Sequence, residues 1–116
     1  MDHSTLILVT GVPGSEKTTL ANALASDVGA SVIGHDWVMA SLKGFPEVWQ
    51  QMQTLDPQEF RSVGWLVMWN LALAELNSDR SVVLDGVARN PEVEQTQHIA
   101  KSAQSLSFVD LCSVSD

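Results

Sequence analysis

The sequence predicts an α/β fold of three layers, in which a parallel sheet of about four strands lies between helices. Three observations lead to this prediction. Short apolar runs typical of buried strands alternate along the chain with segments of helical spacing. A glycine-rich loop joins the first run to the first helical segment. Acidic residues stand where the second and third runs end, at the edge where such a sheet binds its ligands.

The first strand and the first helix are the most clearly marked elements. Residues 5–10 form an almost unbroken apolar run that ends at Gly11, as in a central strand buried on both faces. Helical spacing begins at Lys17, and Gly29 is placed to end that helix. A second short strand is expected at residues 31–33, after which the periodicity weakens. The apolar stripe of the first helix is expected at Leu20, Leu24 and Val28.

A long helix is expected in the middle of the chain. Residues 56–59 have the form of a capping box with Asp56 as the N-cap, and the helix should extend to about Asn77. Trp65 and Trp69 lie four residues apart on one side and are interpreted as core residues rather than as a ligand site. Spacing places the main apolar face elsewhere, on Phe60, Val63, Val67, Leu71 and Ala74.

The last third of the chain predicts a strand, a helix and a strand. Residues 81–85 form a third apolar run that ends in Asp85. Asn90 begins a polar helix that is expected to end near Gln104. Residues 106–114 are expected to form the fourth strand.

Composition limits the classes of protein that fit this fold. The chain has 116 residues, 45% of them hydrophobic, which favours a single domain over residues 1–116. A net charge of −8, from fourteen acidic and six basic residues, opposes broad nucleic-acid binding. The one cysteine, Cys112, excludes an internal disulfide and is interpreted as a core residue rather than a nucleophile. Without a basic leader or an apolar stretch of roughly 20 residues, we expect a cytoplasmic protein with no membrane contact.

Residues 11–18 nearly match the phosphate-binding form G-x-x-x-x-G-K-[ST]. In that form backbone N–H groups cradle phosphates, the lysine neutralises them and the hydroxyl binds Mg²⁺. Lys17 and Thr18 match, whereas Glu16 stands where a glycine is expected, which brings a negative charge and, if the backbone needs a positive φ, strain. The alternative is an ordinary strand-to-helix turn. Nucleotide contacts are expected from Gly11, Val12, Pro13, Gly14, Ser15, Glu16, Lys17, Thr18 and Thr19.

Two acids at strand ends are candidates for phosphoryl-transfer chemistry. Asp85 resembles the acid that ends a Walker B strand, and with Thr18 it is a candidate Mg²⁺ ligand. Asp36 is a candidate base that accepts a proton from a substrate hydroxyl, so Lys17 and Asp36 are the catalytic candidates. The alternative role for Asp36 is a helix N-cap. Arg89 is either a phosphate or substrate contact or an exposed surface residue.

The remaining polar residues are interpreted as structural. Glu92 and Glu94 stand in a first helical turn, where the helix dipole favours acids, and need no function. His3, His35 and His98 lack the spacing of metal ligands and are expected to be solvated or locally hydrogen-bonded.

Residues 11–18, the His35–Asp36 step and residues 82–89 together resemble the P-loop kinase-like ATP-binding proteins sometimes called AAA domains. That family is similar to polynucleotide kinase, chloramphenicol phosphotransferase, gluconate kinase and zeta toxin. The resemblance implies a P-loop NTPase fold and a partial domain, since an arginine-bearing lid and a fifth strand usually follow. The roles it carries over are phosphate and Mg²⁺ binding for Lys17 and Thr18, substrate activation for Asp36 and the Walker B acid for Asp85.

These observations favour an ATP-dependent and Mg²⁺-dependent kinase that phosphorylates a hydroxyl of a small molecule or nucleotide. The alternative is a degenerate or truncated P-loop protein that binds nucleotide weakly and does not catalyse transfer. Glu16 and the absent lid point to that alternative. A GTPase switch is disfavoured because the chain has no N-K-x-D sequence for base recognition.

Overall fold

The computed structural model describes residues 4–11, 16–103 and 107–113. Strands and helices alternate in it as the sequence predicts, and the α/β fold class is confirmed. The elements in chain order are β1 (Thr5–Gly11), α1 (Lys17–Val28), β2 (Ser31–Gly34), α2 (His35–Lys43), α3 (Pro46–Met52), α4 (Pro57–Asn77), β3 (Val82–Asp85), α5 (Asn90–Ser102) and β4 (Ser107–Ser113).

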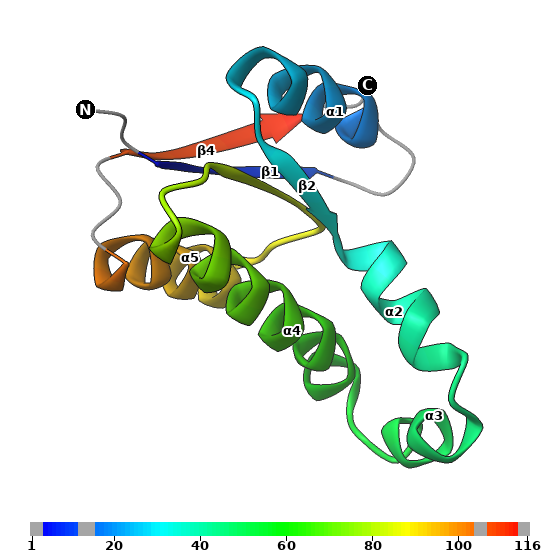
Figure 1. The fold of residues 1–116 in the computed structure, drawn as a ribbon. Coiled ribbons are helices and arrows are strands. Elements are labelled where there is room, and N and C mark those ends of the chain that lie inside the picture. Colours follow the sequence, from blue (N-terminus) through cyan, green and yellow to red (C-terminus); the bar gives the residue numbers. More distant parts are fainter. Residues whose placement is uncertain (1–3, 12–15, 104–106, 114–116) are drawn as a thin grey trace.

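The strands form one parallel sheet in the order β2-β3-β1-β4 (Figure 1). The first strand is therefore an interior strand, as predicted. Asp85 pairs with Val9 of β1 and with Gly34 of β2. Because the carboxyl ends of parallel strands share one edge, this register brings the segments that follow β1, β2 and β3 together.

Helices cover both faces of the sheet, with α1 on one face and α4 and α5 on the other (Figure 1). Side chains of β1 alternate between these layers, as the pleat of a strand requires. Ile7 and Val9 pack in the cluster that contains α1, whereas Leu6 and Leu8 pack in the cluster that contains α4 and α5. The predicted arrangement of a sheet between two helical layers is confirmed.

α1 has the predicted bounds, but its buried stripe differs from the prediction. Gly29 ends the helix with a φ of 67°, the left-handed region that favours glycine. Ala21 and Ala25 are the buried apolar residues, whereas Val28 is 47% exposed. The prediction that Val28 lies on the buried stripe is therefore wrong, and Leu20 and Leu24 only flank it. Alanine side chains are small enough to let the helix approach the sheet closely.

α4 begins and ends where the sequence predicts, and Asp56 Oδ1 accepts the Glu59 backbone N–H at 2.8 Å as its N-cap. Its predicted core face is wrong, since Leu71 is 48% exposed and Trp65 is 1% exposed. The helix is apolar on several sides, so spacing alone did not identify the side that meets the sheet. The interpretation of the tryptophan pair as core is confirmed. The buried residues are Gly64, Trp65, Met68, Ala72 and Leu76.

Residues 35–52 form two helices, α2 and α3, where the sequence shows only weak periodicity. Figure 1 shows that both extend beyond the sheet beside the first turns of α4. α2 approaches α4 closely at Gly64, where a Cβ atom would meet His35 Nε2 at 2.6 Å and Met39 Sδ at 2.9 Å. We call these two helices the α2–α3 arm.

The C-terminal elements follow the prediction with small shifts. α5 ends at Ser102 rather than near Gln104, and β4 begins at Ser107. The side chain of Cys112, in β4, lies outside the described part of the chain, so its predicted burial stays a prediction.

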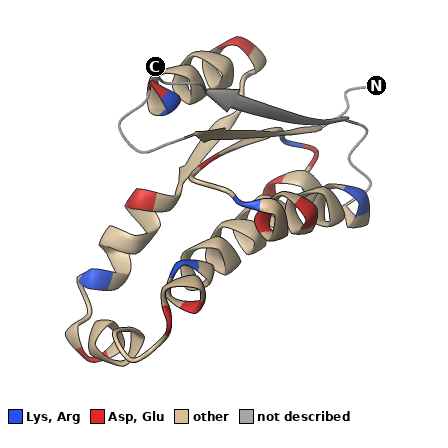
Figure 2. Ribbon diagram, turned by 180° about the vertical axis from the view of Figure 1, so that it is seen from behind, with Lys and Arg blue, Asp and Glu red and all other residues tan. Residues whose placement is uncertain are grey.

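Two further features of the fold concern the basic residues and the helices. Figure 2 shows Lys and Arg placed singly along the ribbon rather than gathered on one element. Within the described ranges, no helix combines the length and the apolar character that crossing a membrane would require.

We expect Asp79→Gly to raise the free energy of unfolding by about 0.5–1 kcal/mol, because Asp79 has a φ of 60° in the turn between α4 and β3. Glycine adopts this conformation without the steric penalty of a Cβ atom. Urea denaturation followed by tryptophan fluorescence measures the change. Asp79→Ala is the matched control and should lower stability; a glycine variant less stable than the parent chain would contradict the prediction.

Candidate active site

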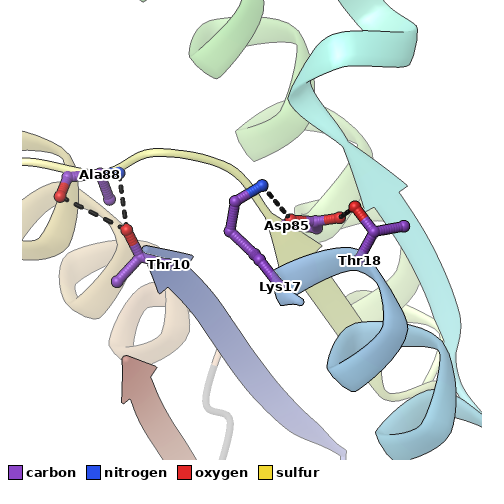
Figure 3. A network of polar contacts seen from close by, with 5 residues as sticks. All are labelled: Thr10, Lys17, Thr18, Asp85 and Ala88. Carbon is purple, nitrogen blue, oxygen red and sulfur yellow. Dashed lines mark hydrogen bonds and ion pairs between the residues drawn. The ribbon is translucent and has the colours of Figure 1, made fainter. Parts of the chain in front are cut away.

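Three polar side chains meet where β3 ends and α1 begins (Figure 3). Lys17 Nζ lies 2.8 Å from Asp85 Oδ1, and their side chains are only 11% and 7% exposed. The Thr18 hydroxyl donates to Asp85 Oδ2 at 3.1 Å. The structure therefore brings together the lysine, the hydroxyl and the candidate Walker B acid that the sequence singles out from positions far apart in the chain.

Backbone contacts fix the segment that follows Asp85. The Ala88 backbone N–H donates to Thr10 Oγ1 at 2.8 Å (Figure 3). The Gly86 N–H donates to the Val9 carbonyl oxygen at 3.2 Å. A Cβ atom on Gly86 would lie 2.9 Å from Trp65 Cζ2, so only glycine fits there without a shift. Both contacts tie the loop after β3 to the end of β1 and hold Asp85 beside the start of α1.

The P-loop is described only in part. Val12, Pro13, Gly14 and Ser15, which the sequence predicts as nucleotide contacts, lie outside the described residues. Glu16 has a φ of −82° and an exposed side chain, so the backbone strain expected at this position is absent and that expectation is wrong. The unfavourable effect expected of Glu16 is therefore its charge alone. Gly11 and Thr19 flank the same region, at the end of β1 and in the first turn of α1.

A cavity of about 510 Å³ opens beside Lys17 and Thr18. Asp36 lines it, as the second residue of α2. The N-cap of α2 is Gly34, so the alternative interpretation of Asp36 as an N-cap is wrong. The cavity is lined by Lys17, Thr18, His35, Asp36, Met39, Trp49, Phe60, Arg61, Gly86 and Val87.

Six side chains of this cavity are not among the site residues that the sequence predicts: His35, Met39, Trp49, Phe60, Arg61 and Val87. His35 Nε2 donates to the Arg61 carbonyl oxygen at 3.0 Å, a longer-range partner than the local one expected. The ring centroids of Trp49 and Phe60 are 5.2 Å apart at 71°, which joins α3 to α4 edge to face. Met39, Trp49, Phe60 and Arg61 belong to no motif, and the packing of the α2–α3 arm against α4 brings them to the cavity.

The structure agrees with the second alternative for Arg89, an exposed surface residue, and a contact with phosphate or substrate stays a prediction. Arg89 is exposed, caps α5, and is not among the described residues that line the cavity. Its backbone N–H donates to Glu92 Oε1 at 2.8 Å. Glu92 is 3% exposed and also accepts from Gln58 Nε2 at 2.8 Å. The interpretation of Glu92 as a first-turn acid complementing the helix dipole is therefore incomplete, because its carboxylate also joins α4 to α5.

The donors beside Asp85 suit a hard cation. Mg²⁺ is commonly held by one or two protein oxygens together with substrate phosphates and water. The Thr18 hydroxyl and the Asp85 carboxylate supply two such oxygens in contact with each other. The described residues include no cluster of three His, Cys, Asp or Glu side chains that could hold a metal ion.

A family model described as an AAA domain matches residues 6–115 of this chain. Uncharacterised proteins of Mycobacterium tuberculosis and Mycobacterium bovis are each 33% identical to it over 99 residues. Those matches cover 80% of this chain and 20% of each relative, so the chain spans about a fifth of the length of these curated relatives.

Solved structures with the same fold are kinases by description. A candidate kinase of Chloroflexus aurantiacus has a TM-score of 0.76 at 22% identity, covering 98% of this chain and 61% of its own. The APS kinase of Mycobacterium tuberculosis has a TM-score of 0.69 at 15% identity, and the match covers 99% of this chain and 78% of that kinase. A gluconokinase of Sinorhizobium meliloti has a TM-score of 0.62 at 21% identity, and the match covers 95% of this chain and 58% of the gluconokinase. The chain belongs to the AAA domain family and has the fold of the P-loop kinases.

Proposed function

We propose that the chain binds Mg-ATP and transfers its γ-phosphoryl group to a hydroxyl of a small molecule or nucleotide. The observation that carries this proposal is the joint contact of Lys17 and Thr18 with the Asp85 carboxylate, beside a cavity lined by Asp36. A lysine, a hydroxyl and two acids in this arrangement are the groups that phosphoryl transfer uses. The kinase fold of the similar structures supports the same reaction class.

Each residue has a proposed role. Residues 11–19 hold the phosphates, with Lys17 neutralising their charge once it leaves Asp85. Thr18 and Asp85 hold Mg²⁺, which supplies positive charge to the phosphate oxygens when bound. Asp36 accepts the proton of the acceptor hydroxyl while the hydroxyl oxygen forms a bond to the γ-phosphorus. The bond between the γ-phosphorus and the β–γ bridging oxygen breaks at the same time, which releases ADP.

The geometry at Glu16 bears on the alternative of a degenerate, inactive protein. The ordinary φ of Glu16 means that the α1 start forms without the glycine of the motif. Its exposed side chain has solvent to turn toward when a nucleotide arrives. These observations favour a weakened nucleotide site over a lost one.

Calorimetric titration with Mg-ATP tests the proposed function. We expect saturable binding to the chain and at least tenfold weaker binding to Lys17→Met, since that variant lacks the charge that pairs with phosphate. Lys43→Met, at the end of α2 and outside the cavity lining, is the matched control and should bind like the parent chain. Saturable binding that Lys17→Met leaves unchanged would refute the assignment.

Glu16→Gly should tighten Mg-ATP binding at least tenfold. A carboxylate about 4 Å from one phosphate charge costs about 4 kcal/mol at an effective dielectric of 20, and half of that corresponds to about thirtyfold in affinity. Because the Glu16 backbone carries no left-handed strain, Glu16→Gln should gain almost as much as Glu16→Gly. Glu94→Gln, an exposed acid on α5, controls for net charge. Equal affinities for all four proteins in the same Mg²⁺ and salt would contradict the prediction.

A further inference from the structure

One part of the cavity wall is built by the α2–α3 arm and the first turns of α4. Trp49 of α3 and Phe60 and Arg61 of α4 line it together with Asp36 of α2. The proposed function assigns roles to Asp36, Lys17 and Thr18 but to none of the other three. Their chemistry therefore bears on which acceptor the cavity takes.

Arg61 carries a charge that no described acid neutralises. Its Nη2 donates to the Gln58 side-chain oxygen at 2.6 Å, and within the described residues it forms no ion pair. A guanidinium has five N–H donors, so one bond to a neutral amide leaves donors for a ligand. A neutral amide does not balance the charge of an arginine as a carboxylate would, so the positive charge of Arg61 has no acidic partner among the described residues.

The Arg61 guanidinium is connected to a buried carboxylate through the exposed side chain of Gln58. Gln58, which accepts from Arg61, donates its own Nε2 to Glu92 Oε2 at 2.8 Å. Glu92 is 3% exposed and accepts at its other oxygen from the Arg89 backbone N–H. A buried carboxylate thus fixes the amide that orients the guanidinium. Such support is what a binding residue needs to hold its geometry before the ligand arrives.

The distribution of positive charge points to an anionic ligand. The whole chain has six Lys and Arg against fourteen acids, and two of those six, Lys17 and Arg61, line this one cavity. Lys17 is paired with Asp85 and is assigned to the phosphates of ATP. Arg61 is the cation that this assignment leaves without a partner.

The aromatic pair gives the same wall a flat apolar part. Trp49 and Phe60 are both only partly buried, and each lines the cavity while contacting the other edge to face. Aromatic side chains of this kind favour apolar or planar groups. A cavity of about 510 Å³ is in the range of sites for small molecules rather than polymers.

We propose that the acceptor is a small hydroxyl compound with an anionic group that Arg61 binds and a planar or apolar body that lies against Trp49 and Phe60. This inference rests on the proposed function for the role of the cavity and deepens it by naming the substrate class. The anion is a carboxylate or a phosphate, since a guanidinium binds both in a bidentate manner.

Four probes separate the parts of this acceptor. Para-(hydroxymethyl)benzoate carries the ring, the hydroxyl and a carboxylate, and para-(hydroxymethyl)phenyl phosphate replaces the carboxylate with phosphate. The benzamide analogue removes the charge, and glycolate removes the ring. Each is titrated into the chain by calorimetry, without nucleotide and again with Mg-ADP so that phosphate cannot occupy the P-loop. We expect at least one charged aromatic probe to bind about tenfold more tightly than the benzamide and than glycolate.

Variants assign that preference to residues. Arg61→Gln should remove the preference for the charged probe over the benzamide, and Arg61→Lys should keep part of it. Arg80→Gln, an exposed arginine paired with Glu75, is the matched control and should change nothing. Trp49→Leu should weaken binding of all three aromatic probes while leaving glycolate unchanged. Thermal unfolding of each variant identifies any that does not fold. The comparison of Arg61→Lys with the parent chain remains informative, because Arg61 is partly exposed and the lysine should be tolerated.

Two results would overturn the inference: charged probes that bind no better than the benzamide, or a preference that survives Arg61→Gln. Failure of the proposed function gives a different result. Mg-ATP would then not bind to the parent chain, whereas the probes would still bind both to the parent chain and to Lys17→Met. Loss of probe binding with intact Mg-ATP binding would instead refute only the acceptor class.

Discussion

Asp85→Ala is expected to lower the free energy of unfolding by about 3 kcal/mol, the largest stability effect in this site. The change leaves the Lys17 ammonium, on a side chain only 11% exposed, without its carboxylate at 2.8 Å. It also removes the acceptor of the Thr18 hydroxyl. Breaking a buried pair from one side costs more than the pair contributes, because the remaining charge stays desolvated. Urea denaturation followed by tryptophan fluorescence measures the effect.

The double variant Lys17→Met with Asp85→Ala is the control for this explanation. With both charges gone, most of the lost stability should return, since no unpaired charge remains in the site. A double variant as unstable as Asp85→Ala would show that the loss comes from packing around β3 rather than from the Lys17 charge. Asp85 would then be a structural residue first, and its assignment as a metal ligand would need independent support.

Asp36→Asn is expected to reduce phosphoryl transfer about a hundredfold while leaving Mg-ATP affinity nearly unchanged. Asparagine keeps the size of the side chain but cannot accept the proton of the acceptor hydroxyl. Asp36 lines the cavity from the first turn of α2, and no described ion pair or cap depends on it. Transfer is measured as acceptor-dependent ADP release, using the acceptor that stimulates the parent chain most.

Asp27→Asn is the matched control for this variant, since Asp27 is an exposed acid on α1 that does not line the cavity. It should change neither transfer nor binding. If Asp36→Asn lowered ATP affinity as much as transfer, Asp36 would be acting on the nucleotide or on the fold. If Asp36→Asn changed neither transfer nor ATP affinity, a different group would have to accept the proton. His35, which precedes Asp36 in the sequence and also lines the cavity, would be the next candidate.

Much of the fold could be predicted because its signals are local. The unbroken apolar run of β1, the glycine after α1 and the aspartate before α4 each specify a boundary through the few residues around it. The side of each helix that faces the core was harder to predict from the sequence, as α1 and α4 show. α4 is apolar on several sides, and only its contacts with β3, α2 and α5 decide that Trp65 is buried and Leu71 is not.

The sequence by itself determined the nucleotide half of the candidate site. Lys17 and Thr18 belong to one contiguous motif, and Asp85 ends a strand whose parallel pairing with β1 brings it to the same edge. A motif and a sheet edge both leave a pattern along the chain, so each residue carries its own signal.

Only the tertiary structure decided the acceptor half. Trp49, Phe60 and Arg61 come from helices whose contact depends on the α2–α3 arm folding against α4, and Arg61 is oriented through Gln58 by the buried Glu92 of α5. The same packing places Asp36, which the sequence predicts as a catalytic base or alternatively as an N-cap, in the cavity wall. Contacts between separate helices depend on shape and burial rather than on any fixed spacing, and therefore they leave no periodic trace in the sequence.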